Sequence, residues 1–291
     1  MEIDEDAGAA GGARPLLAIW KLASCDGCQL SILALEDELL TFAKVVKIAH
    51  FTEISKADLG GPYDLSLVEG SVSTPRDELL VEEIRQISKR LIAIGACATA
   101  GGIQALRNYA SAGEYSRSVY EHPEYLSFSD LSTPVSAHVK VDLELHGCPI
   151  DRYQLLEVVT AELVGRRPVL PTYSVCQECK ARGTVCLLVS KQEYCLGPVT
   201  RAGCGAICPS NGRGCYGCFG PQQAANPSSL SRRFIEDGAS RVHLMHLFHT
   251  FNAAAPPFST EGLRYRDLEV VDGDQSIEVE DQSIEVEDHD S

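Results

Sequence analysis

The stretch LLAIWKLASCDGCQLSIL, residues 16–33, places two cysteines directly after an apolar segment. The apolar run LLAIWK at 16–21 is typical of a buried β-strand. From residue 29 to 43 apolar side chains recur at helical spacing. They are Leu30, Leu33, Leu35, Leu39, Leu40 and Ala43. The stretch therefore predicts a strand, a turn that carries Cys25 and Cys28, and one long helix.

Strand-like and helix-like segments continue to alternate as far as residue 165. Further strands are predicted at 45–51, 64–70, 91–95 and 139–147, and further helices at 77–90 and 149–165. Thr74 and Pro75 supply the N-cap and first-turn signals for the helix at 77–90. Because such alternation predicts an open parallel sheet with helices on both faces, we expect an α/β, flavodoxin-like domain over residues 15–167.

Cysteines stand at the ends of three of these predicted strands. Cys25 and Cys28 follow the first strand, Cys97 follows the fourth, and Cys148 follows the fifth. Ligand sites of open α/β sheets lie at the carboxyl ends of the strands, so these thiols should meet at one edge. Either Cys97 or Cys148 alone would be interpreted as a small buried apolar residue. Their common position with the CxxC pair instead predicts one site with four thiolates.

The other eight of the twelve cysteines lie between residues 176 and 218. Their spacing is Cys176-x2-Cys179-x6-Cys186-x8-Cys195, then Cys204-x3-Cys208-x6-Cys215-x2-Cys218. This part of the chain has little periodic hydrophobicity, so we expect bound metal to organise a second domain over residues 168–265. The twelve cysteines thus predict three four-thiolate sites.

Two metals suit sites of this kind. The CxxC pairs at 176/179 and 215/218 could each begin a structural zinc site. Four ligands scattered over a sheet edge would be an unusual zinc site, whereas iron-sulfur clusters combine CxxC pairs with remote cysteines. The spacing therefore favours iron-sulfur, and twelve thiolates permit three [4Fe-4S] clusters. Three clusters in one chain indicate electron conduction.

Composition and charge exclude several other classes of protein. The 291 residues include 44% hydrophobic and 23% charged side chains, as in ordinary globular proteins. The net charge of −16 comes from the ends: four acidic residues in 1–6 and eleven in 267–291, with 26 acidic and 25 basic residues between. We expect 1–14 and 266–291 to be acidic disordered segments, the second carrying the repeated DQSIEVE. The sequence has no basic stripe that would neutralise phosphates, so we do not expect nucleic-acid binding.

The sequence also bears on the compartment. Residues 1–15 have no apolar stretch of the kind found in secretory signals, and no apolar run is long enough to span a bilayer. Clustered cysteines in a reducing compartment bind metal more often than each other. We therefore expect a cytoplasmic protein that is not embedded in a membrane.

Five stretches of the chain resemble the small subunit of nickel-iron hydrogenases. They are WKLASCDGCQLSIL around Cys25 and Cys28, LVEGSVST around Glu69, GACATAGG around Cys97, GCPID around Cys148, and CLGPVTRAGCGAICPSNGRGCYGCFGP over 195–221. The resemblance spans about residues 15–222. It implies an oxidoreductase subunit that relays electrons, while hydrogen is split at a nickel-iron (NiFe) centre in a separate large subunit.

The resemblance also implies which thiols share a cluster. The cluster nearest the active site, the proximal one, would be held by Cys25, Cys28, Cys97 and Cys148. The medial cluster would be held by Cys204, Cys208, Cys215 and Cys218. The distal cluster would be held by Cys176, Cys179, Cys186 and Cys195. No residue of this chain would be catalytic, because the residues that matter would be ligands.

Two positions indicate the branch of that family. Membrane-bound uptake enzymes usually have His where this chain has Cys176 and Pro where it has Cys208. With cysteine at both, the chain resembles the cytoplasmic, bidirectional branch that includes sulfhydrogenase delta subunits. That likeness implies NAD(P) as acceptor, reached through a flavin (FAD) and NAD(P)-binding diaphorase subunit and a ferredoxin-like iron-sulfur subunit. Relatives that reduce coenzyme F420 or are heterodisulfide-linked also have all-cysteine small subunits and are the alternative.

Two further classes stay open. A quinone-reductase subunit of the 20 kDa type shares the expected sheet but has one cluster and paired adjacent cysteines, which are missing here. A zinc-organised interaction protein would be colourless. Iron and acid-labile sulfide counts separate these classes, because three cubanes would bind about twelve of each.

Several polar side chains near the cysteines admit an ordinary structural interpretation. Glu69 is expected either to line a proton path or to cap the turn that follows it, and His146 to be a satisfied buried histidine. The three histidines at 243, 246 and 249 are expected to form one side of an amphipathic segment and not a metal site. Lys21 and Arg201 are expected either to stabilise reduced clusters or to be solvated.

Overall fold

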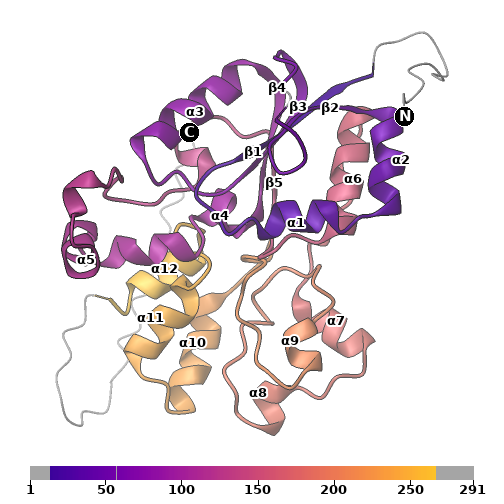
Figure 1. Cartoon of the computed structure of the whole chain (residues 1–291). Coiled ribbons are helices and arrows are strands. Elements are labelled where there is room, and N and C mark those ends of the chain that lie inside the picture. Colours follow the sequence, from indigo (N-terminus) through magenta and orange to yellow (C-terminus); the bar gives the residue numbers. More distant parts are fainter. Residues whose placement is uncertain (1–13, 57, 267–291) are drawn as a thin grey trace, which may run out of the picture.

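A computed structural model describes residues 14–56 and 58–266, and its core is a sheet of five parallel strands (Figure 1). The spatial order is β2-β1-β3-β4-β5, which is the order of flavodoxin-like folds. The strands are β1 (Leu16–Lys21), β2 (Lys47–Phe51), β3 (Tyr63–Glu69), β4 (Ser88–Ile94) and β5 (Leu143–Leu145). The predicted α/β class is confirmed. The two acidic terminal segments, apart from Arg14 and Arg266, lie outside the described residues.

The register of the sheet aligns the carboxyl ends of four strands. Lys21 of β1 pairs with Glu69 of β3, which in turn pairs with Ile94 of β4. Ile94 pairs with Leu145 of β5. These residues form one row across the sheet, so the turns after β1, β4 and β5 leave it at the same edge.

Helices cover both faces of the sheet, because strands buried on both faces need apolar partners on each side (Figure 1). One face packs against α1 (Gly27–Leu33), α2 (Asp37–Val45) and α6 (Arg152–Leu163). The other face packs against α3 (Pro75–Gln86), whose Val81 and Ile84 are fully buried.

The start of α3 follows the prediction. The Thr74 hydroxyl accepts a hydrogen bond from the Asp77 N–H at 3.1 Å, and the Asp77 carboxylate accepts one from the Thr74 N–H at 2.9 Å. Thr74 and Asp77 thus form a capping box, with Pro75 in the first turn.

The long helix predicted over 29–43 is wrong as a single element. It is broken between α1 and α2, where Glu36 adopts a φ of 49°. The break lets Leu35 turn into the core, where only 2% of its surface is exposed, while Leu30 and Leu40 of the predicted stripe stay exposed. Burial of Leu35 against the sheet thus overrides a continuous helical period.

Other boundaries also differ. The helix predicted as far as residue 90 ends at Gln86, and β4 already begins at Ser88. The strand predicted over 139–147 is paired only over Leu143–Leu145. The region 108–135 contains α5 (Ala112–Val119) and short 3-10 turns.

The cysteine-rich part of the chain is irregular, as expected. It holds only the short helices α7 (Val175–Ala181), α8 (Leu187–Ser190) and α9 (Ile207–Ser210). Beyond it the chain forms α10 (Pro227–Glu236), α11 (Arg241–His249) and α12 (Phe258–Leu263), which pack together at the end of the described chain (Figure 1).

These last helices have an apolar core that the sequence does not predict. Phe234, Phe248 and Phe258 are fully buried, and Leu196 and Val199 of the cysteine-rich segment pack in the same cluster. Apolar contacts therefore stabilise residues 168–265, in addition to any metal that the thiols bind. Among the described residues, no helix combines the length and apolar character needed to cross a membrane.

Candidate iron-sulfur sites

The first set of thiols gathers at the carboxyl edge of the sheet. Cys25 and Cys28 lie in the turn from β1 into α1, Cys97 lies in α4 (Gly95–Ala100) directly after β4, and Cys148 follows β5. The Ala96 N–H donates to the Gly147 carbonyl at 2.7 Å and ties the last two turns together. The structure thus brings together the four thiols that the sequence predicts at this edge.

The thiols of this first set influence each other's ionisation. Burial, with the nearby Cys97 and Cys25 thiols adding to it, raises the pKa of Cys148 to about 11. Burial also raises the pKa of Cys28, and the carboxylate of Glu69 raises it further. Thiolates packed together in a low dielectric are stable only when a cation compensates them. The set is therefore suited to a positively charged iron group.

Two glycines leave room for the sulfurs. A Cβ on Gly95 would lie 2.5 Å from the Cys28 sulfur, and one on Gly102 would lie 2.6 Å from the Cys97 sulfur. Both glycines also have positive φ, +85° and +63°. Because larger residues are excluded by both contact and backbone conformation, the close approach of the chain to the thiols depends on these glycines.

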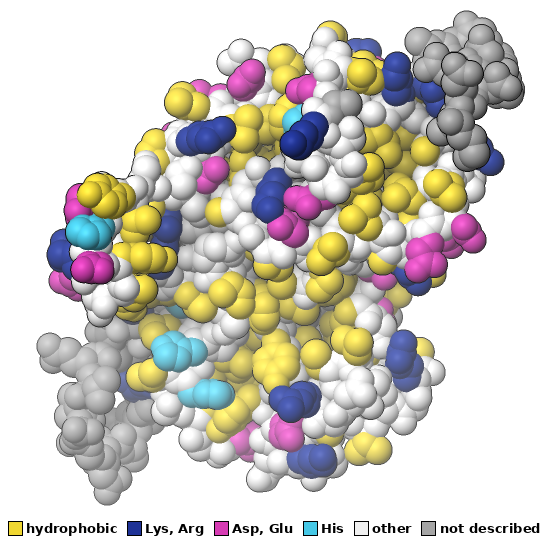
Figure 2. All heavy atoms as spheres, in the orientation of Figure 1, with side chains coloured by type: hydrophobic (Ala, Val, Ile, Leu, Met, Phe, Trp, Pro, Cys, Tyr) yellow, Lys and Arg dark blue, Asp and Glu magenta, His cyan; other side chains and the backbone are white. Residues whose placement is uncertain are grey.

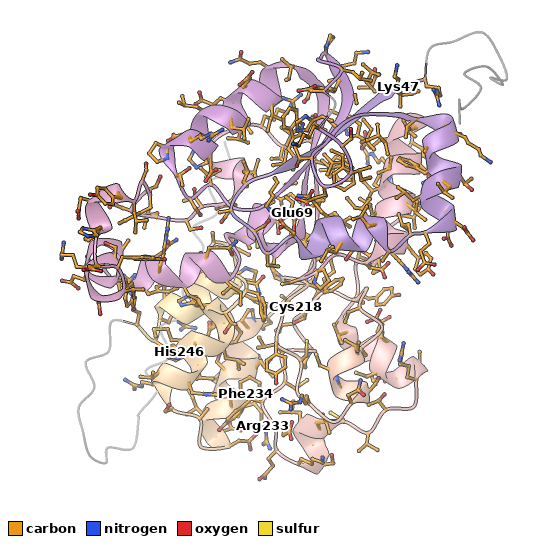
Figure 3. All side chains as sticks on the ribbon, viewed as in Figure 1. Lys47, Glu69, Cys218, Arg233, Phe234 and His246 are labelled. Atoms are coloured by element: carbon orange, nitrogen blue, oxygen red, sulfur yellow. The ribbon has the colours of Figure 1, made fainter. Side chains whose placement is uncertain are left out.

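Glu69 caps the turn that carries the first two thiols. Its two carboxylate oxygens accept hydrogen bonds from the N–H groups of Cys28 at 3.1 Å and Gln29 at 3.3 Å. Only 2% of Glu69 is exposed, and burial raises its pKa. Glu69 therefore does cap a turn, but it is the turn from β1 into α1 and not, as expected, the turn that follows Glu69 in the chain. Figure 3 shows Glu69 between the sheet and the lower part of the molecule.

A second set surrounds a cavity of about 90 Å³ in the cysteine-rich segment. α7 presents Cys176 and Cys179 one turn apart, and Cys186 immediately precedes α8. Apolar side chains form most of the rest of the wall, together with Lys180 and Thr184. The lining includes Cys176, Cys179, Cys186 and Cys195 together with Leu187, Leu188, Pro198 and Pro209.

The third set comprises Cys204, Cys208, Cys215 and Cys218. Burial, followed by the thiols of Cys204, Cys148 and Cys208, raises the pKa of Cys218 to about 12. Burial also raises the pKa of Cys215 well above its ordinary value. The sulfur of Cys215 accepts a hydrogen bond from the Gly217 N–H at 3.5 Å.

The third set lies between the other two. On one side the Cys148 thiol of the first set is close enough to Cys218 to raise its pKa. On the other side the Cys215 N–H donates to the Cys195 sulfur of the second set at 3.2 Å. Figure 3 shows Cys218 below Glu69, between the sheet and the C-terminal helices. The order in space is therefore first, third, second.

The donor sets can be compared with the two metals that suit them. A zinc site needs four sulfurs about 2.3 Å from a single ion. Within the described residues, no three His, Cys, Asp or Glu side chains are arranged to hold one metal ion. The second set instead lines a cavity, and backbone N–H groups are directed at the sulfurs of Cys195 and Cys215, which is the environment that tunes iron-sulfur clusters. The residues present fit an iron-sulfur group.

Two polar side chains near the thiols were missed by sequence reasoning. Glu178, inside the CQEC motif of α7, accepts hydrogen bonds from the N–H groups of Gly203 at 2.9 Å and Ala206 at 3.1 Å, and so fixes the loop of Cys204. Gln104 accepts a hydrogen bond from the Cys97 thiol at 3.4 Å and donates to the Ala23 carbonyl at 2.6 Å. The sequence position of Glu178 between two cysteines could have indicated its role near the thiols. Nothing in the sequence indicated the role of Gln104.

The three histidines of α11 have different surroundings. His249 is buried and stacks on Tyr109 with ring centroids 4.3 Å apart, while His243 and His246 are exposed. The three histidines therefore do not share one side of the helix, because His249 faces the interior while the other two face solvent. Elsewhere, His146 lies beside Gly220, and burial followed by the Arg201 charge lowers its pKa to about 4.

The two cations near the thiols also differ in their environment. Lys21 forms ion pairs with Asp26 at 2.5 Å and Glu53 at 3.8 Å, and the hydrogen bond that it donates to Asp26 raises its pKa. Arg201 is half-buried, donates to the Pro221 carbonyl at 3.4 Å, and has a lowered pKa because of burial. Lys21 is therefore already neutralised by carboxylates, whereas Arg201 is partly desolvated.

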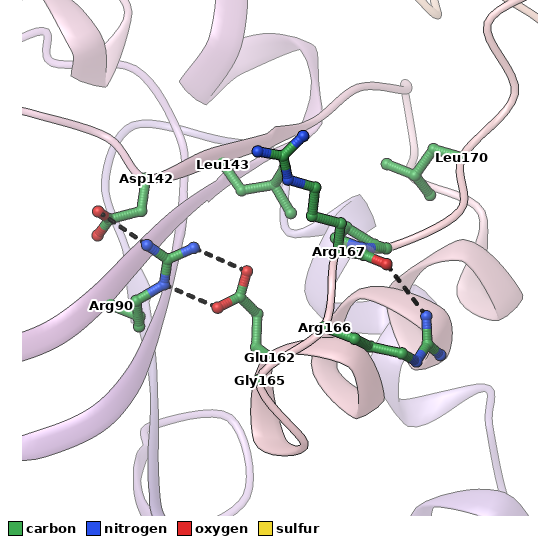
Figure 4. Close-up of a pocket in the computed structure, with 9 residues that line it drawn as sticks. Arg90, Asp142, Leu143, Glu162, Gly165, Arg166, Arg167 and Leu170 are labelled. Carbon is green, nitrogen blue, oxygen red and sulfur yellow. Dashed lines mark hydrogen bonds and ion pairs between the residues drawn. The ribbon is translucent and has the colours of Figure 1, made fainter.

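A groove of about 610 Å³ opens at the other edge of the sheet, beside the start of β4 and β5 (Figure 4). Its lining contains no cysteine. Arg90 spans it and forms ion pairs with Asp142 at 3.2 Å and Glu162 at 2.7 Å. This ion-pair network links the sheet to α6 and is separate from the thiol sets.

Comparison with known proteins gives the class. Residues 25–161 match the family described as the 20 kDa subunit of NADH ubiquinone oxidoreductase. The chain is 38% identical to sulfhydrogenase 2 subunit delta of Pyrococcus furiosus over 70% of its own length and 86% of that protein. It is 32% identical to a vhu-type F420-non-reducing hydrogenase subunit of Methanococcus voltae, over 83% of the chain and 95% of the relative.

Solved structures agree. An NAD⁺-reducing [NiFe]-hydrogenase in the H₂-reduced state matches with a TM-score of 0.51 and 28% identity, covering 55% of this chain and 96% of the other. The Ni-Fe-Se hydrogenase of Desulfomicrobium baculatum shares the fold, with a TM-score of 0.53 at 16% identity over 76% and 99% of the two chains.

The fold and the similarities together define an oxidoreductase subunit of the iron-sulfur electron-transfer class. The chain belongs to the family of small subunits of NiFe hydrogenases, together with the sulfhydrogenase delta subunit and its counterparts in F420-non-reducing hydrogenases.

Proposed function

We propose that this subunit carries electrons through three [4Fe-4S] clusters in series, each held by one set of four thiols. The observation that carries the proposal is the contiguity of the sets: Cys218 is close to Cys148, and the Cys215 N–H donates to the Cys195 sulfur. A single structural or hydrolytic site would need only one such set. A relay requires that neighbouring sets lie close together. The first contact joins the first and third sets, and the second contact joins the third and second sets.

In this proposal the ligands fall into three groups along the path. The proximal cluster is held by Cys25, Cys28, Cys97 and Cys148, the medial cluster by Cys204, Cys208, Cys215 and Cys218, and the distal cluster by Cys176, Cys179, Cys186 and Cys195. Residues 15–167 form the domain of the proximal cluster, and residues 168–265 form the domain of the other two.

Bound at these thiols, a [4Fe-4S] cluster supplies reversible one-electron transfer at a potential set by charge, hydrogen bonds and solvent exposure. The chain controls those three factors. Glu69 and Glu178 fix the loops that carry ligands by accepting hydrogen bonds from backbone N–H groups. The N–H groups of Cys215 and Gly217 are directed at sulfur. Leu187 and Leu188 line part of the cavity of the second set.

The partners follow from the same path. A large subunit with the nickel-iron centre would bind beside the exposed Cys25 end, where the proximal cluster lies. Electrons would leave from the distal end to a flavin and NAD(P)-binding diaphorase subunit and a ferredoxin-like iron-sulfur subunit. The delta subunit of the NAD-reducing hydrogenase HoxS of Cupriavidus necator, 28% identical over 50% of this chain and 77% of its own length, supports this acceptor.

A second acceptor is favoured by a separate observation. Relatives named as F420-non-reducing hydrogenase subunits match at 35% and 32% identity and over more of the chain than the NAD-reducing relative. A heterodisulfide-linked partner is therefore the second candidate. Isolation of the intact complex with its neighbouring subunits, followed by H₂-dependent reduction assays with NAD⁺, NADP⁺ and F420, distinguishes the two. H₂-dependent reduction of NAD(P)⁺ supports the first acceptor, and its absence together with a co-purifying heterodisulfide reductase supports the second.

The relay itself is tested by anaerobic purification and counting of iron and acid-labile sulfide. We expect about twelve of each per chain and electron paramagnetic resonance (EPR) signals from three reduced clusters. About four of each would indicate a one-cluster subunit of the quinone-reductase type. A colourless protein that contains zinc would overturn the proposal.

A further inference from the structure

We propose that the distal end of this subunit docks an electron carrier with an acidic, apolar-centred face, through a basic surface that we call the exit patch. The exit patch is defined as the exposed residues Lys180, Arg182, Val185, Val189 and Lys191, all within six positions of Cys186 in the sequence. The inference rests on the proposed relay, because a docking face matters for electron transfer only if Cys186 holds a cluster.

Cys186 is the point where the second set of thiols reaches the surface. It is exposed, whereas Cys176 and Cys179 are half-buried and Cys195 is buried. Electron transfer needs close approach, so a carrier that receives electrons from this set must contact the surface near Cys186. The surrounding side chains therefore decide which carriers can bind.

The centre of the patch is apolar. Val185 and Val189 are 68% and 80% exposed, and they flank Cys186 on both sides in the sequence. Val185 also lines the cavity that holds the second set of thiols. Single exposed valines are common on monomers, but two beside an exposed ligand form the kind of apolar centre found in protein interfaces.

The rim of the patch is basic. Lys180, Arg182 and Lys191 are all exposed. Lys180 lines the same cavity as Val185, and the Arg182 guanidinium lies beside Gly205, next to the third set. Figure 2 shows Lys and Arg side chains on the lower part of the molecule, below the sheet domain.

No carboxylate of the surrounding segment neutralises this rim. Residues 172–221 contain five Lys or Arg and only two acidic side chains, a net charge of +3 in a chain whose total is −16. Both acidic side chains are turned to the backbone: Glu178 accepts from the Gly203 and Ala206 N–H groups, and Glu193 accepts from the Gly214 N–H at 3.2 Å. The charge of the patch thus favours a partner of opposite sign.

The surface near the first set differs in this respect. Lys21, which precedes Cys25 by four residues, is paired with Asp26 and Glu53. The positive, unneutralised surface is therefore a property of the distal end and not of thiol sites in general. This asymmetry would direct an acidic carrier to the end of the relay.

The test uses the full chain loaded with clusters, reduced and freed of excess reductant, and two matched electron acceptors. One acceptor is cytochrome c, which is basic; the other is the same cytochrome after succinylation, which converts its lysines to carboxylates. Stopped-flow absorbance gives the second-order rate of haem reduction. At low salt we expect succinylated cytochrome to react at least about 10-fold faster than the basic form, with the difference shrinking as salt screens the charges.

The double variant Arg182→Glu/Lys191→Glu should lower the rate with succinylated cytochrome about 10-fold or more at low salt. The matched control Lys44→Glu/Lys47→Glu makes the same change in net charge at two exposed lysines of α2 and β2, and should change the rate less than about two-fold. EPR midpoint potentials are measured in both variants, because Arg182 lies beside Gly205 and reversal of its charge can shift the potential of the third set. Only the loss of rate that exceeds the effect of any measured shift in potential is assigned to docking.

Each result has a distinct meaning. Equal rates for the two double variants, or a faster reaction with unmodified cytochrome c, would overturn the exit patch while leaving the relay intact. A preparation without iron would overturn the relay and the patch together. A selective loss in the Arg182→Glu/Lys191→Glu protein supports the patch.

Discussion

Single glycines limit what can stand beside the sulfurs of the first set. Gly95 and Gly102 place backbone where any side chain would meet Cys28 or Cys97. A substitution at either glycine would cause both a steric clash with a sulfur atom and backbone strain at positive φ. A control variant must therefore separate the clash from the strain. Gly165 offers that control: it has a φ of +70° but no atom within 4 Å of an added Cβ.

Gly95→Ala should therefore remove one cluster. The added methyl group would lie 2.5 Å from the Cys28 sulfur, so the sulfur must move. We expect the iron content to fall by about four per chain, measured on anaerobically purified protein. Gly165→Ala should keep all its iron and lose only about 1–2 kcal/mol of stability from the left-handed backbone. Equal iron in the two variants would show that the Gly95 contact is not needed.

Cys186→Ser addresses the distal set in the same way. Loss of one thiolate from a four-thiolate site should reduce the iron count from about twelve to about eight, with the EPR signals of the other two clusters retained. Val189→Ser is the nearby control, since that side chain is exposed and does not line the cavity of the second set. Retention of the full iron count in the Cys186→Ser protein would contradict the assignment.

Elements connect the cluster edge to the rest of the fold. The turns after β1, β4 and β5 meet because the register aligns Lys21, Glu69, Ile94 and Leu145 in one row. At the opposite edge, Arg90 of β4 pairs with Asp142, before β5, and with Glu162 of α6. The sheet is thus fastened at both ends, by thiol-bearing turns at one and by ion pairs at the other.

Arg90→Ala should lower the stability of the sheet without changing the clusters. Glu162 is only 11% exposed and loses its ion pair when the cation is removed, whereas Asp142, 12% exposed, keeps its ion pair with Arg85 at 2.7 Å. We expect a loss of about 1–2 kcal/mol, reduced by the partial exposure of Arg90, read as a lower melting temperature of the loaded protein by circular dichroism. Arg117→Ala on exposed α5 is the control and should stay within about 0.5 kcal/mol.

Elements also show where sequence reasoning succeeds. The meeting of Cys25, Cys28, Cys97 and Cys148 was predictable because strand direction and order fix which turns share an edge. The break at Glu36 was not, because the helical period continues through it and only burial of Leu35 in three dimensions explains it. The inward turn of Glu178 was equally invisible, since it depends on N–H groups more than twenty residues away.

At the scale of the whole molecule, some parts of the fold are stabilised by apolar cores, and one part is rich in thiols and poor in regular structure. The sheet domain has its own apolar core, and the last three helices form a second core that includes Leu196 and Val199 of the cysteine-rich segment. The rest of residues 172–221 has only short helices and many thiols. From the sequence, metal was expected to organise all of 168–265, because the phenylalanines of α10, α11 and α12 are too far apart along the chain to suggest a shared core.

Removal of iron should therefore affect the molecule unevenly. After treatment with a chelator and an oxidant under denaturant-free conditions, we expect fast amide exchange in residues 172–221 and retained protection in the sheet and in α10–α12. Hydrogen-deuterium exchange by mass spectrometry measures this directly. Uniform protection before and after iron removal would show that the thiol segment is held without metal.

The stack of His249 on Tyr109 has a consequence for biogenesis. The stack joins the end of α11 to Tyr109. A hydrogen bond from the Ala254 N–H to the carbonyl of Ala100, the last residue of α4, joins the same two parts of the chain. The ribosome makes α4 long before α11, so this clasp closes only after every thiol has been synthesised.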